Sequence, residues 1–191
     1  MVRCGAIALA LVIVWSTVTY AGDDEARHTA ELELVAATIW RAITTRDTEA
    51  LLRHVRPDLL DGVRRALAMP HSGLSCALFD TDCLQARLPQ NAIVRTSVAE
   101  FFRSQPNARL RITFLGQAMF RLESPFDLAM LAWVVPGSEA DQNFPRHDLR
   151  RWGVDHVNTC LIHTKAIGWR FHSGAGVFFC GGSLMLKPDA R

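Results

Sequence analysis

The sequence lacks the short motifs by which many enzymes are recognised. It contains no Walker loop, no GxGxxG dinucleotide motif, no HExxH pair and no close CxxC pairs. The segment His172-Ser173-Gly174-Ala175-Gly176 also lacks the first glycine of a serine nucleophile elbow. Because no catalytic signature is present, the sequence favours a protein that is not an enzyme, and we expect neither a cofactor nor a bound metal.

Lysine is scarce, and charges of the two signs nearly balance. Lys165 and Lys187 are the only lysines, and 21 basic residues stand against 19 acidic ones, for a net charge of +2. A protein that binds nucleic acid or an anionic membrane surface needs a strongly basic face. We therefore expect no nucleic-acid partner; a small apolar or anionic ligand and another protein remain as partners.

The segment from Met1 to Ala21 has the three parts of a secretory signal peptide. Arg3 supplies the positive start, Ala6–Trp15 the apolar core, and Thr19-Tyr20-Ala21 the cleavage site. The apolar core is too short to span a bilayer. We expect cleavage after Ala21 and export to the periplasm or outside the cell, with no integral membrane segment left. The alternative is an N-terminal membrane anchor that stays uncut.

The remaining chain predicts a single α+β domain over residues 22–180, followed by a C-terminal tail over residues 181–191. Apolar residues at helical spacing predict a long helix over residues 25–44, with Asp23 or Asp24 as its N-cap. The elements predicted next are a break at residues 45–47, helices on either side of Pro57, a loop over residues 69–73, a short strand over Ala77–Asp80, and a helix that Asn91 caps and Pro106 stops.

From Ala108 the apolar period changes to two, which predicts strands. Alternate residues of the first strand are apolar as far as Leu122, so one face of this strand is expected to pack on the core. The segment Phe126–Val135 is apolar on both faces apart from Asp127, which predicts a central strand. One face would pack on a helix and the other on a loop or on a second subunit of a homodimer. The elements predicted last are a loop over residues 137–151 and two strands, residues 153–164 and 169–179, joined by a turn at residues 165–168.

The cysteines that follow the signal peptide are even in number, which in an exported chain predicts two disulfides. They are Cys76, Cys83, Cys160 and Cys180. We favour Cys76 with Cys83, which closes a small local loop, and Cys160 with Cys180; the other two connectivities stay open. A four-thiolate zinc site is the alternative, but it would need closely spaced cysteine pairs.

Helices come first in the predicted order, and long antiparallel strands end in the hairpin segment Gly168-Trp169-Arg170-Phe171. This order resembles the nuclear transport factor 2-like superfamily, whose fold is a cystatin-like cone. The segment Ile43–Leu52 also resembles the usual step from the first to the second helix of these folds. The resemblance covers residues 24–179 and is one of architecture. It implies a curved antiparallel sheet wrapped around a long N-terminal helix, with a mouth that holds a ligand, an active site or nothing.

Two activities of this superfamily depend on particular residues. The ketosteroid isomerase branch uses a tyrosine inside the cone, and the only tyrosine here, Tyr20, lies in the predicted signal peptide. A second branch opens epoxides with an Asp-Arg-Asp set. Asp127, Asp155 and either Arg111 or Arg121 offer these residue types, but no motif fixes their geometry, and we interpret Asp127 as a residue at the end of a strand.

Histidines give the remaining candidates for a site. If the last hairpin turns at residues 165–168, His163 lies opposite Arg170 and shares a face with Asp155 and His172. A face of His, Arg and Asp side chains is suited to binding an anion, holding a metal or acid–base catalysis. The alternative is the solvated side of a sheet, and a shift of one residue in the register would divide these residues between two faces.

These expectations combine into one preferred function and two alternatives. We expect an exported, disulfide-stabilised binding or interaction protein of the nuclear transport factor 2-like type. The first alternative is a small hydrolase or lyase that uses His163, His172, Asp155 and Arg170, which requires these side chains to converge in a pocket. The second is an inhibitor or immunity-type protein that acts on a partner through an exposed surface such as the loop at residues 137–151.

Overall fold

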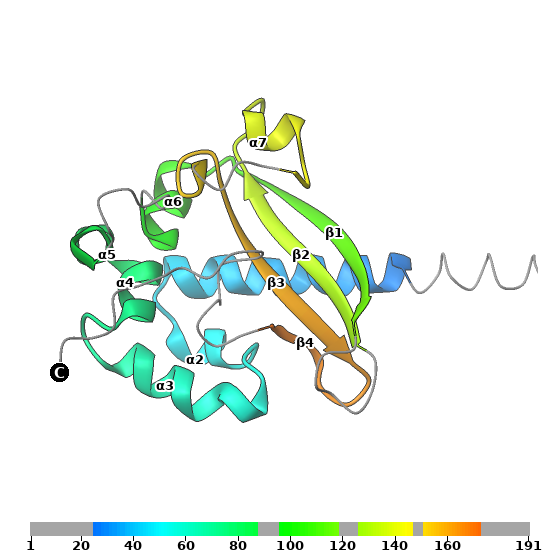
Figure 1. The fold of residues 1–191 in the computed structure, drawn as a ribbon, viewed down its shortest axis with the longest axis horizontal. Coiled ribbons are helices and arrows are strands. Elements are labelled where there is room, and N and C mark those ends of the chain that lie inside the picture. Colours follow the sequence, from blue (N-terminus) through cyan, green and yellow to red (C-terminus); the bar gives the residue numbers. More distant parts are fainter. Residues whose placement is uncertain (1–24, 88–95, 119–125, 147–150, 173–191) are drawn as a thin grey trace, which may run out of the picture.

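Helices come first along the chain, and a four-stranded antiparallel sheet packs against them, so the predicted α+β class is confirmed (Figure 1). A computed structural model describes residues 25–87, 96–118, 126–146 and 151–172. The predicted signal peptide and the predicted tail lie outside these residues. Within the described residues, no helix combines the length and the apolar character that crossing a membrane requires.

The first helix, whose described part covers residues 25–44, has the buried apolar face that its sequence predicts. The residues of this face that are at most 1% exposed are Leu32, Ala36, Ile39 and Ile43. Their spacing of three and four residues places them on one side of the helix. This side joins the main core between the helix and the sheet. The predicted N-cap residues, Asp23 and Asp24, lie outside the described part of the chain.

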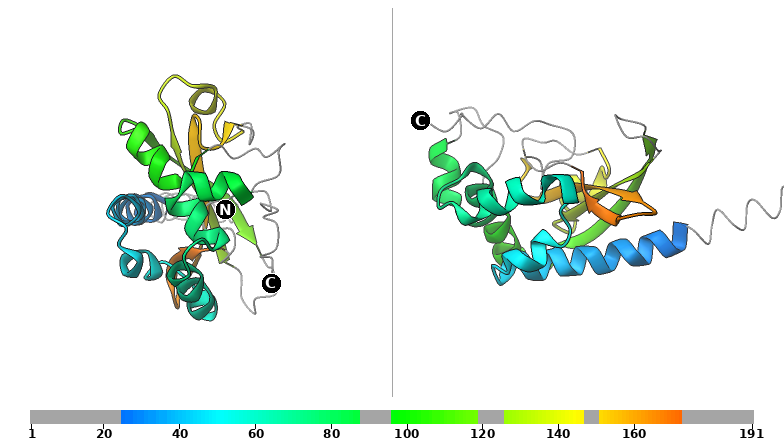
Figure 2. Two further views of the ribbon diagram at one scale, coloured as in Figure 1. Left: turned by 90° about the vertical axis from the view of Figure 1, so that its left-hand side faces the viewer. Right: turned by 90° about the horizontal axis from the view of Figure 1, so that it is seen from below.

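The predicted break at residues 45–47 is confirmed. The chain turns at Arg46, whose φ of 56° lies in the left-handed region. Asp47 then caps α2 (Thr48–Leu52) by accepting a hydrogen bond from the Ala50 amide at 2.9 Å. The helices that follow are η1 (Pro57–Leu59), α3 (Leu60–Ala68), α4 (Gly73–Phe79) and α5 (Thr81–Arg87). Figure 2 shows α3, α4 and α5 gathered at one end of the molecule, away from the N-terminal end of the first helix.

The strand predicted over Ala77–Asp80 is wrong, because these residues lie in helix α4 and at its C-cap. Ser72 caps this helix, and its Oγ accepts a hydrogen bond from the Ser75 amide at 3.1 Å. The apolar run Ala77-Leu78-Phe79 is too short for its period to distinguish a strand from a helix. The N-cap, rather than the apolar run, therefore decides the local structure.

A disulfide joins α4 to α5. It links Cys76, which is 1% exposed, to Cys83, and their Cα atoms lie 5.3 Å apart. This is the first of the two pairs favoured from the sequence. Cys160 lies on a strand of the sheet, whereas Cys180 lies outside the described residues, so the second pair stays a prediction.

Helix α6 (Val98–Ser104) has a different N-cap from the one predicted. Its cap is Ser97, whose Oγ accepts a hydrogen bond from the Glu100 amide at 3.3 Å. The prediction that Asn91 caps this helix is therefore wrong, and Asn91 itself lies outside the described residues. The helix packs into the main core through Phe102, which is 2% exposed.

The sheet has the strand order β1-β2-β3-β4. Its strands are β1 (Arg109–Ala118), β2 (Phe126–Val134), β3 (His156–Thr164) and β4 (Gly168–Phe171). β2 lies between β1 and β3, as its apolar sequence predicts. Alternate residues of β2 join the main core; they are Ala129, Leu131 and Trp133. β4 ends at Phe171, and residues 173–179 of the strand predicted over residues 169–179 lie outside the described part of the chain.

The predicted loop at residues 137–151 contains a short helix, α7 (Glu139–Gln142), that covers part of the outer sheet face. The buried residues of this second apolar cluster are Ala132, Val134 and Ala140, and Phe144 packs against them. The prediction of a loop without helical structure is therefore wrong for this segment. α7 supplies the loop cover that was one of the two alternatives for this face of β2.

The alternation predicted for β1 stops at a bulge. The pairing of β1 with β2 shifts between Phe114 and Gly116, and Leu115 is 46% exposed. The residues before the bulge that pack on the main core are Leu110, Ile112 and Phe114, as predicted. A bulge moves later side chains to the other face, so the single face predicted as far as residue 122 is wrong. Residues 119–125 lie outside the described part.

Candidate functional site

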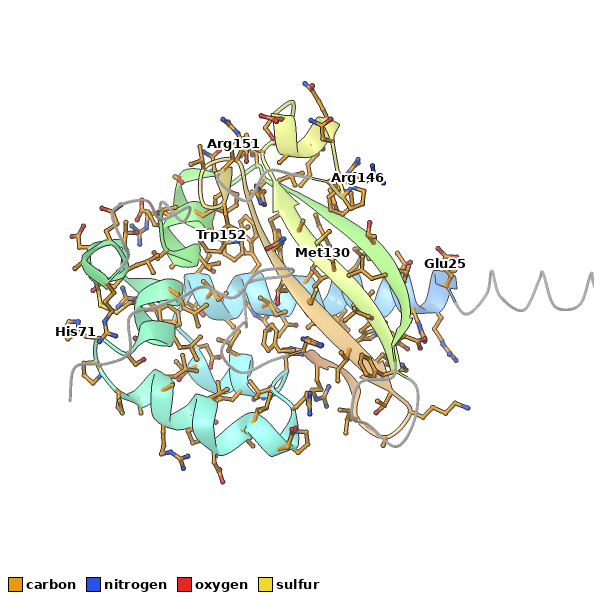
Figure 3. All side chains as sticks on the ribbon, viewed as in Figure 1. Glu25, His71, Met130, Arg146, Arg151 and Trp152 are labelled. Atoms are coloured by element: carbon orange, nitrogen blue, oxygen red, sulfur yellow. A yellow bond between two sulfur atoms is a disulfide. The ribbon has the colours of Figure 1, made fainter. Side chains whose placement is uncertain are left out.

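Two polar residues of the first helix lie near its N-terminal end. His28 and Glu31 are three residues apart, which places both side chains on the same side of the helix. Figure 3 marks this end of the molecule by Glu25 and the far end of the sheet by Arg151. The side chain of Glu31 is 46% exposed, and His28 is half-buried.

β2 and β3 bring two further polar residues to the same place. Asp127 and His163 lie directly opposite each other in the β2–β3 ladder, and Asp127 Oδ2 is 3.8 Å from His163 Nδ1. The rings of His28 and His163 have centroids 4.7 Å apart. We call His28, Glu31, Asp127 and His163 the histidine–carboxylate site.

Aromatic side chains form the apolar side of this site. Trp169 of β4 is 3% exposed, and its ring centroid lies 5.0 Å from that of His163 and 5.5 Å from that of His28. The ring of Phe114 on β1 lies 6.5 Å from that of His28. Apolar neighbours lower the local dielectric, which strengthens the electrostatic interactions of any charge held beside them.

His163 carries a neutral ring near neutral pH. Burial lowers its pKa below the usual histidine value, and the charge of His28 lowers it further. The carboxylates of Glu31 and Asp127 raise the pKa without reversing the shift. A neutral imidazole keeps a ring nitrogen lone pair, which can accept a proton or bind a metal.

The ligand types of the site suit a cation better than an anion. One atom from each of His28, Glu31 and His163 lies within 4.8 Å of the other two. Imidazole nitrogens and carboxylate oxygens bind transition-metal cations. Two carboxylates repel a free anion, so the anionic ligand expected from the sequence does not fit this place.

A second group of potential metal ligands does not form a site. His71, Asp80 and Cys83 also bring one ligand atom each within 4.8 Å of the others. The sulfur of Cys83 is bonded to that of Cys76, however, and metals bind the free thiolate. His71 and Asp80 are both exposed, so this group is a surface cluster beside the disulfide.

The β3–β4 hairpin has a shorter turn than predicted, which separates the candidate residues of the sequence. Gly168, with a φ of 64°, pairs with Thr164 instead of lying in the turn. His163 therefore lies opposite Trp169 and not opposite Arg170. This shift of one residue places Arg170 on the other face of the sheet from His163.

Arg170 and His172 lie on the outer face, and neither reaches the histidine–carboxylate site. Arg170 Nη1 donates a hydrogen bond to the Trp169 carbonyl at 2.7 Å. The His172 amide donates to the Cys160 carbonyl at 2.9 Å, which continues the β3–β4 pairing by one residue. The side chain of His172 is exposed.

Asp155 lies at the opposite end of β3, in a buried polar network. Its Oδ2 accepts a hydrogen bond from Arg151 Nε at 2.5 Å, and its Oδ1 is 3.0 Å from His156 Nδ1. Burial raises the pKa of Asp155, but hydrogen bonds from His156 and Arg151 and the charge of Arg151 outweigh it and hold this pKa below its usual range. Asp155 therefore does not converge with His163, Arg170 and His172 in the way that the hydrolase or lyase alternative requires.

The Asp-Arg-Asp set considered from the sequence does not form among the described residues. Asp127 and Asp155 lie near opposite ends of the sheet. Arg111 points to α7, where its Nε lies 3.8 Å from Asp141 Oδ1. Arg121 lies outside the described part of the chain.

His28 and Glu31 were not among the candidates that the sequence suggested. Their spacing of three residues on a predicted helix was a usable signal, because residues i and i+3 share a helix face. The contact of this face with His163 depends on how the helix packs on the sheet, which no local pattern contains.

Comparison with known proteins gave no match of significant similarity, whether to a family model, to a curated protein or to a solved structure. The fold and the site define a class by themselves: an α+β protein with a histidine–carboxylate group between its first helix and its sheet.

Proposed function

We propose that the chain is an exported, disulfide-stabilised binding protein of the nuclear transport factor 2-like type, and that it takes its ligand at the histidine–carboxylate site. The order of a long first helix followed by an antiparallel sheet supports the likeness to this superfamily. The histidine–carboxylate site lies where the first helix and the sheet, the two parts of such a cone, come together.

One observation carries the binding function. His28, Glu31, Asp127 and His163 come from three separate segments; one ligand atom each of His28, Glu31 and His163 lies within 4.8 Å of the others, and Asp127 Oδ2 lies 3.8 Å from His163 Nδ1. The side chains of His163 and Asp127 keep 17% and 35% of their exposure, so solvent and small ligands reach them. Polar groups that are gathered, partly exposed and backed by aromatic rings are typical of a binding site.

The hydrolase or lyase alternative loses support from the same geometry. It requires His163, His172, Asp155 and Arg170 to converge, but the register of the last hairpin divides them between two faces and two ends of the sheet. A binding function requires no such convergence. The inhibitor alternative relied on an exposed loop at residues 137–151, part of which packs on the sheet through Ala140.

The Cys76–Cys83 disulfide supports an oxidising compartment, because such bonds persist mainly outside the cytosol. Expression of the full chain in a bacterial host tests export directly. We expect the periplasmic fraction to hold a protein that begins at Gly22, with Cys160 joined to Cys180 in peptides mapped without reduction. Recovery of the uncut chain in the cytoplasm or in the membrane would overturn the export proposal.

A ligand screen tests the binding function. Thermal unfolding of the purified protein is measured with a panel of divalent metal chlorides, inorganic phosphate and a short fatty acid. We expect at least one member to raise the melting temperature, since a ligand that binds only the native state stabilises it. The same member should not stabilise a His28→Ala/Glu31→Gln variant. A panel without effect, or an effect equal in the variant, would contradict the proposal.

A further inference from the structure

The ligand types and charges of the histidine–carboxylate site point to one kind of ligand. We propose that the site binds a zinc ion through His28, Glu31 and His163, and that Asp127 positions the His163 ring. This inference rests on the binding function proposed above and names its ligand. The fourth position of a tetrahedral zinc ion is then left to water or to a further ligand.

The ligand atoms already lie close to the spacing that zinc needs. Ligand atoms of a tetrahedral zinc site lie about 3.4 Å apart, given bonds of about 2.1 Å to the metal. The atoms of His28, Glu31 and His163 lie within 4.8 Å of one another, so side-chain rotations that bring these atoms closer by up to about 1.4 Å close the site. Glu31 is exposed and free to make most of this movement.

Charge supports a divalent cation. The site holds two carboxylates, Glu31 and Asp127, whose charges would balance the two positive charges of the metal. Arg27 competes for Glu31, but its Nε lies 4.0 Å from Glu31 Oε1 and both side chains are largely exposed, at 63% and 46%. Ion pairs of this kind contribute little, so the metal displaces Arg27.

The imidazoles select the kind of metal. Calcium and magnesium take oxygen ligands, whereas two histidines with one carboxylate are typical of zinc sites that keep an open position. Copper(I) and iron–sulfur clusters favour thiolates, and Cys83 and Cys76 are oxidised. Among these metals, zinc is the one that two imidazoles and one carboxylate fit best.

Asp127 lies where it can interact with the ring of His163 without binding the metal itself. Its Oδ2 lies 3.8 Å from His163 Nδ1, and with Nδ1 on the side of Asp127, Nε2 of the same ring would be the nitrogen that binds the metal. A carboxylate beside a ligating histidine fixes the orientation of the ring and raises its basicity. The wall formed by Trp169 and Phe114 holds both rings from the apolar side.

The experiment titrates ZnCl2 into the chelator-stripped full chain, purified in its oxidised form, and follows the heat of binding near neutral pH. We expect one zinc ion per chain. His28→Ala and Glu31→Gln should each weaken binding at least about tenfold, and Asp127→Asn by about 10- to 100-fold. Glu31→Gln and Asp127→Asn conserve size, and circular dichroism checks that His28→Ala, which removes a ring packed on His163 and Trp169, still folds.

Two matched variants serve as controls. Glu33→Gln removes an exposed carboxylate from the other side of the same helix, and His172→Ala removes an exposed histidine from the other face of the sheet. Neither should change zinc affinity. Cobalt(II) supplies a second readout: its visible spectrum should show four-coordination in the wild type and in Asp127→Asn at saturation, but not in His28→Ala.

The outcomes separate zinc from binding in general. No zinc binding, or binding that His28→Ala and Glu31→Gln leave unchanged, would overturn the zinc proposal. If another member of the ligand panel then stabilises the wild type and not the double variant, the binding function stands without zinc. If no member does so, both proposals fail.

Discussion

Asp127 and His163 stand directly opposite each other on neighbouring strands, with Asp127 Oδ2 3.8 Å from His163 Nδ1. At this distance the interaction is Coulombic rather than a direct hydrogen bond. The carboxylate raises the pKa of a ring whose burial lowers it. The pKa of His163 thus depends on opposing effects of burial and of the neighbouring carboxylates, and a single substitution of a carboxylate should change it.

The first prediction concerns that balance. In the metal-free protein, Asp127→Asn should lower the pKa of His163 further, because it removes a negative charge that favours the imidazolium. Glu31→Gln should act in the same direction. An NMR titration of the imidazole nitrogens measures the change. Glu33→Gln, on the other side of the helix, should leave the titration where it was; an equal shift in this control would contradict the assigned neighbours.

The second prediction concerns stability in acid. Burial, with the charges of Arg170 and Arg53, lowers the pKa of His54 from 6.5 to about 4. Between pH 6.5 and about 4, His54 is therefore protonated in the unfolded chain but stays neutral in the native protein. The free energy of unfolding that this residue contributes above pH 6.5 is lost as the pH falls toward 4. The loss should be on the order of 2 kcal/mol, since the ring keeps some exposure.

Urea unfolding at a series of pH values measures this loss. A His54→Asn variant should show a flatter dependence of unfolding free energy on pH over the same window. His71→Asn is the matched control, because His71 is exposed and its positive φ of 62° is tolerated by asparagine. A flatter profile in His71→Asn as well would count against His54 as the source.

The third prediction concerns the disulfide between α4 and α5. Cys76→Ala/Cys83→Ala removes a link across a sequence separation of 7 residues, so the loss of unfolding free energy should be about 2 kcal/mol. Urea unfolding measures it. The wild type and the double variant are also compared with and without a reductant. Reduction should lower the free energy of unfolding less in the variant than in the wild type. An equal decrease in both would mean that the Cys76–Cys83 disulfide is not the source of the stabilisation.

The fourth prediction concerns the turn that sets the register of the last hairpin. Gly168 has a φ of 64°, and a Cβ there would meet only Arg170 Nη1 at 3.8 Å. Gly168→Ala should therefore cost about 1–2 kcal/mol through backbone conformation alone. Gly62→Ala in α3 is the contrasting change, because nothing lies within 4 Å of its added Cβ and the backbone is helical. It should stabilise the protein by about 0.5–1 kcal/mol in the same unfolding assay.

The parts of the fold that the sequence predicted are those with a strong local period. Leu32, Ala36 and Ile39 mark the buried side of the first helix, and the doubly apolar β2 is the strand between two others. The strand predicted at Ala77 failed because a three-residue apolar run carries no period and the cap at Ser72 decides it.

The candidate site was less predictable because it depends on distances between segments. Among the predicted site residues, His163 reaches the site, but its partners His28 and Glu31 lie far away in the chain. A turn that includes Gly168 is one residue longer than the observed turn, in which Gly168 pairs with Thr164. This one-residue difference in register decides which face of the sheet Arg170 occupies. Sequence periodicity alone does not resolve a step of this size.

The assembly of the histidine–carboxylate site from the first helix and two distant strands has a consequence for folding. A ligand that contacts His28 and His163 together acts as a cross-link that exists only in the native chain. Opening of the first helix away from the sheet would release the ligand. Occupancy should therefore slow hydrogen exchange throughout the first helix, well beyond the turn that carries the ligand contacts.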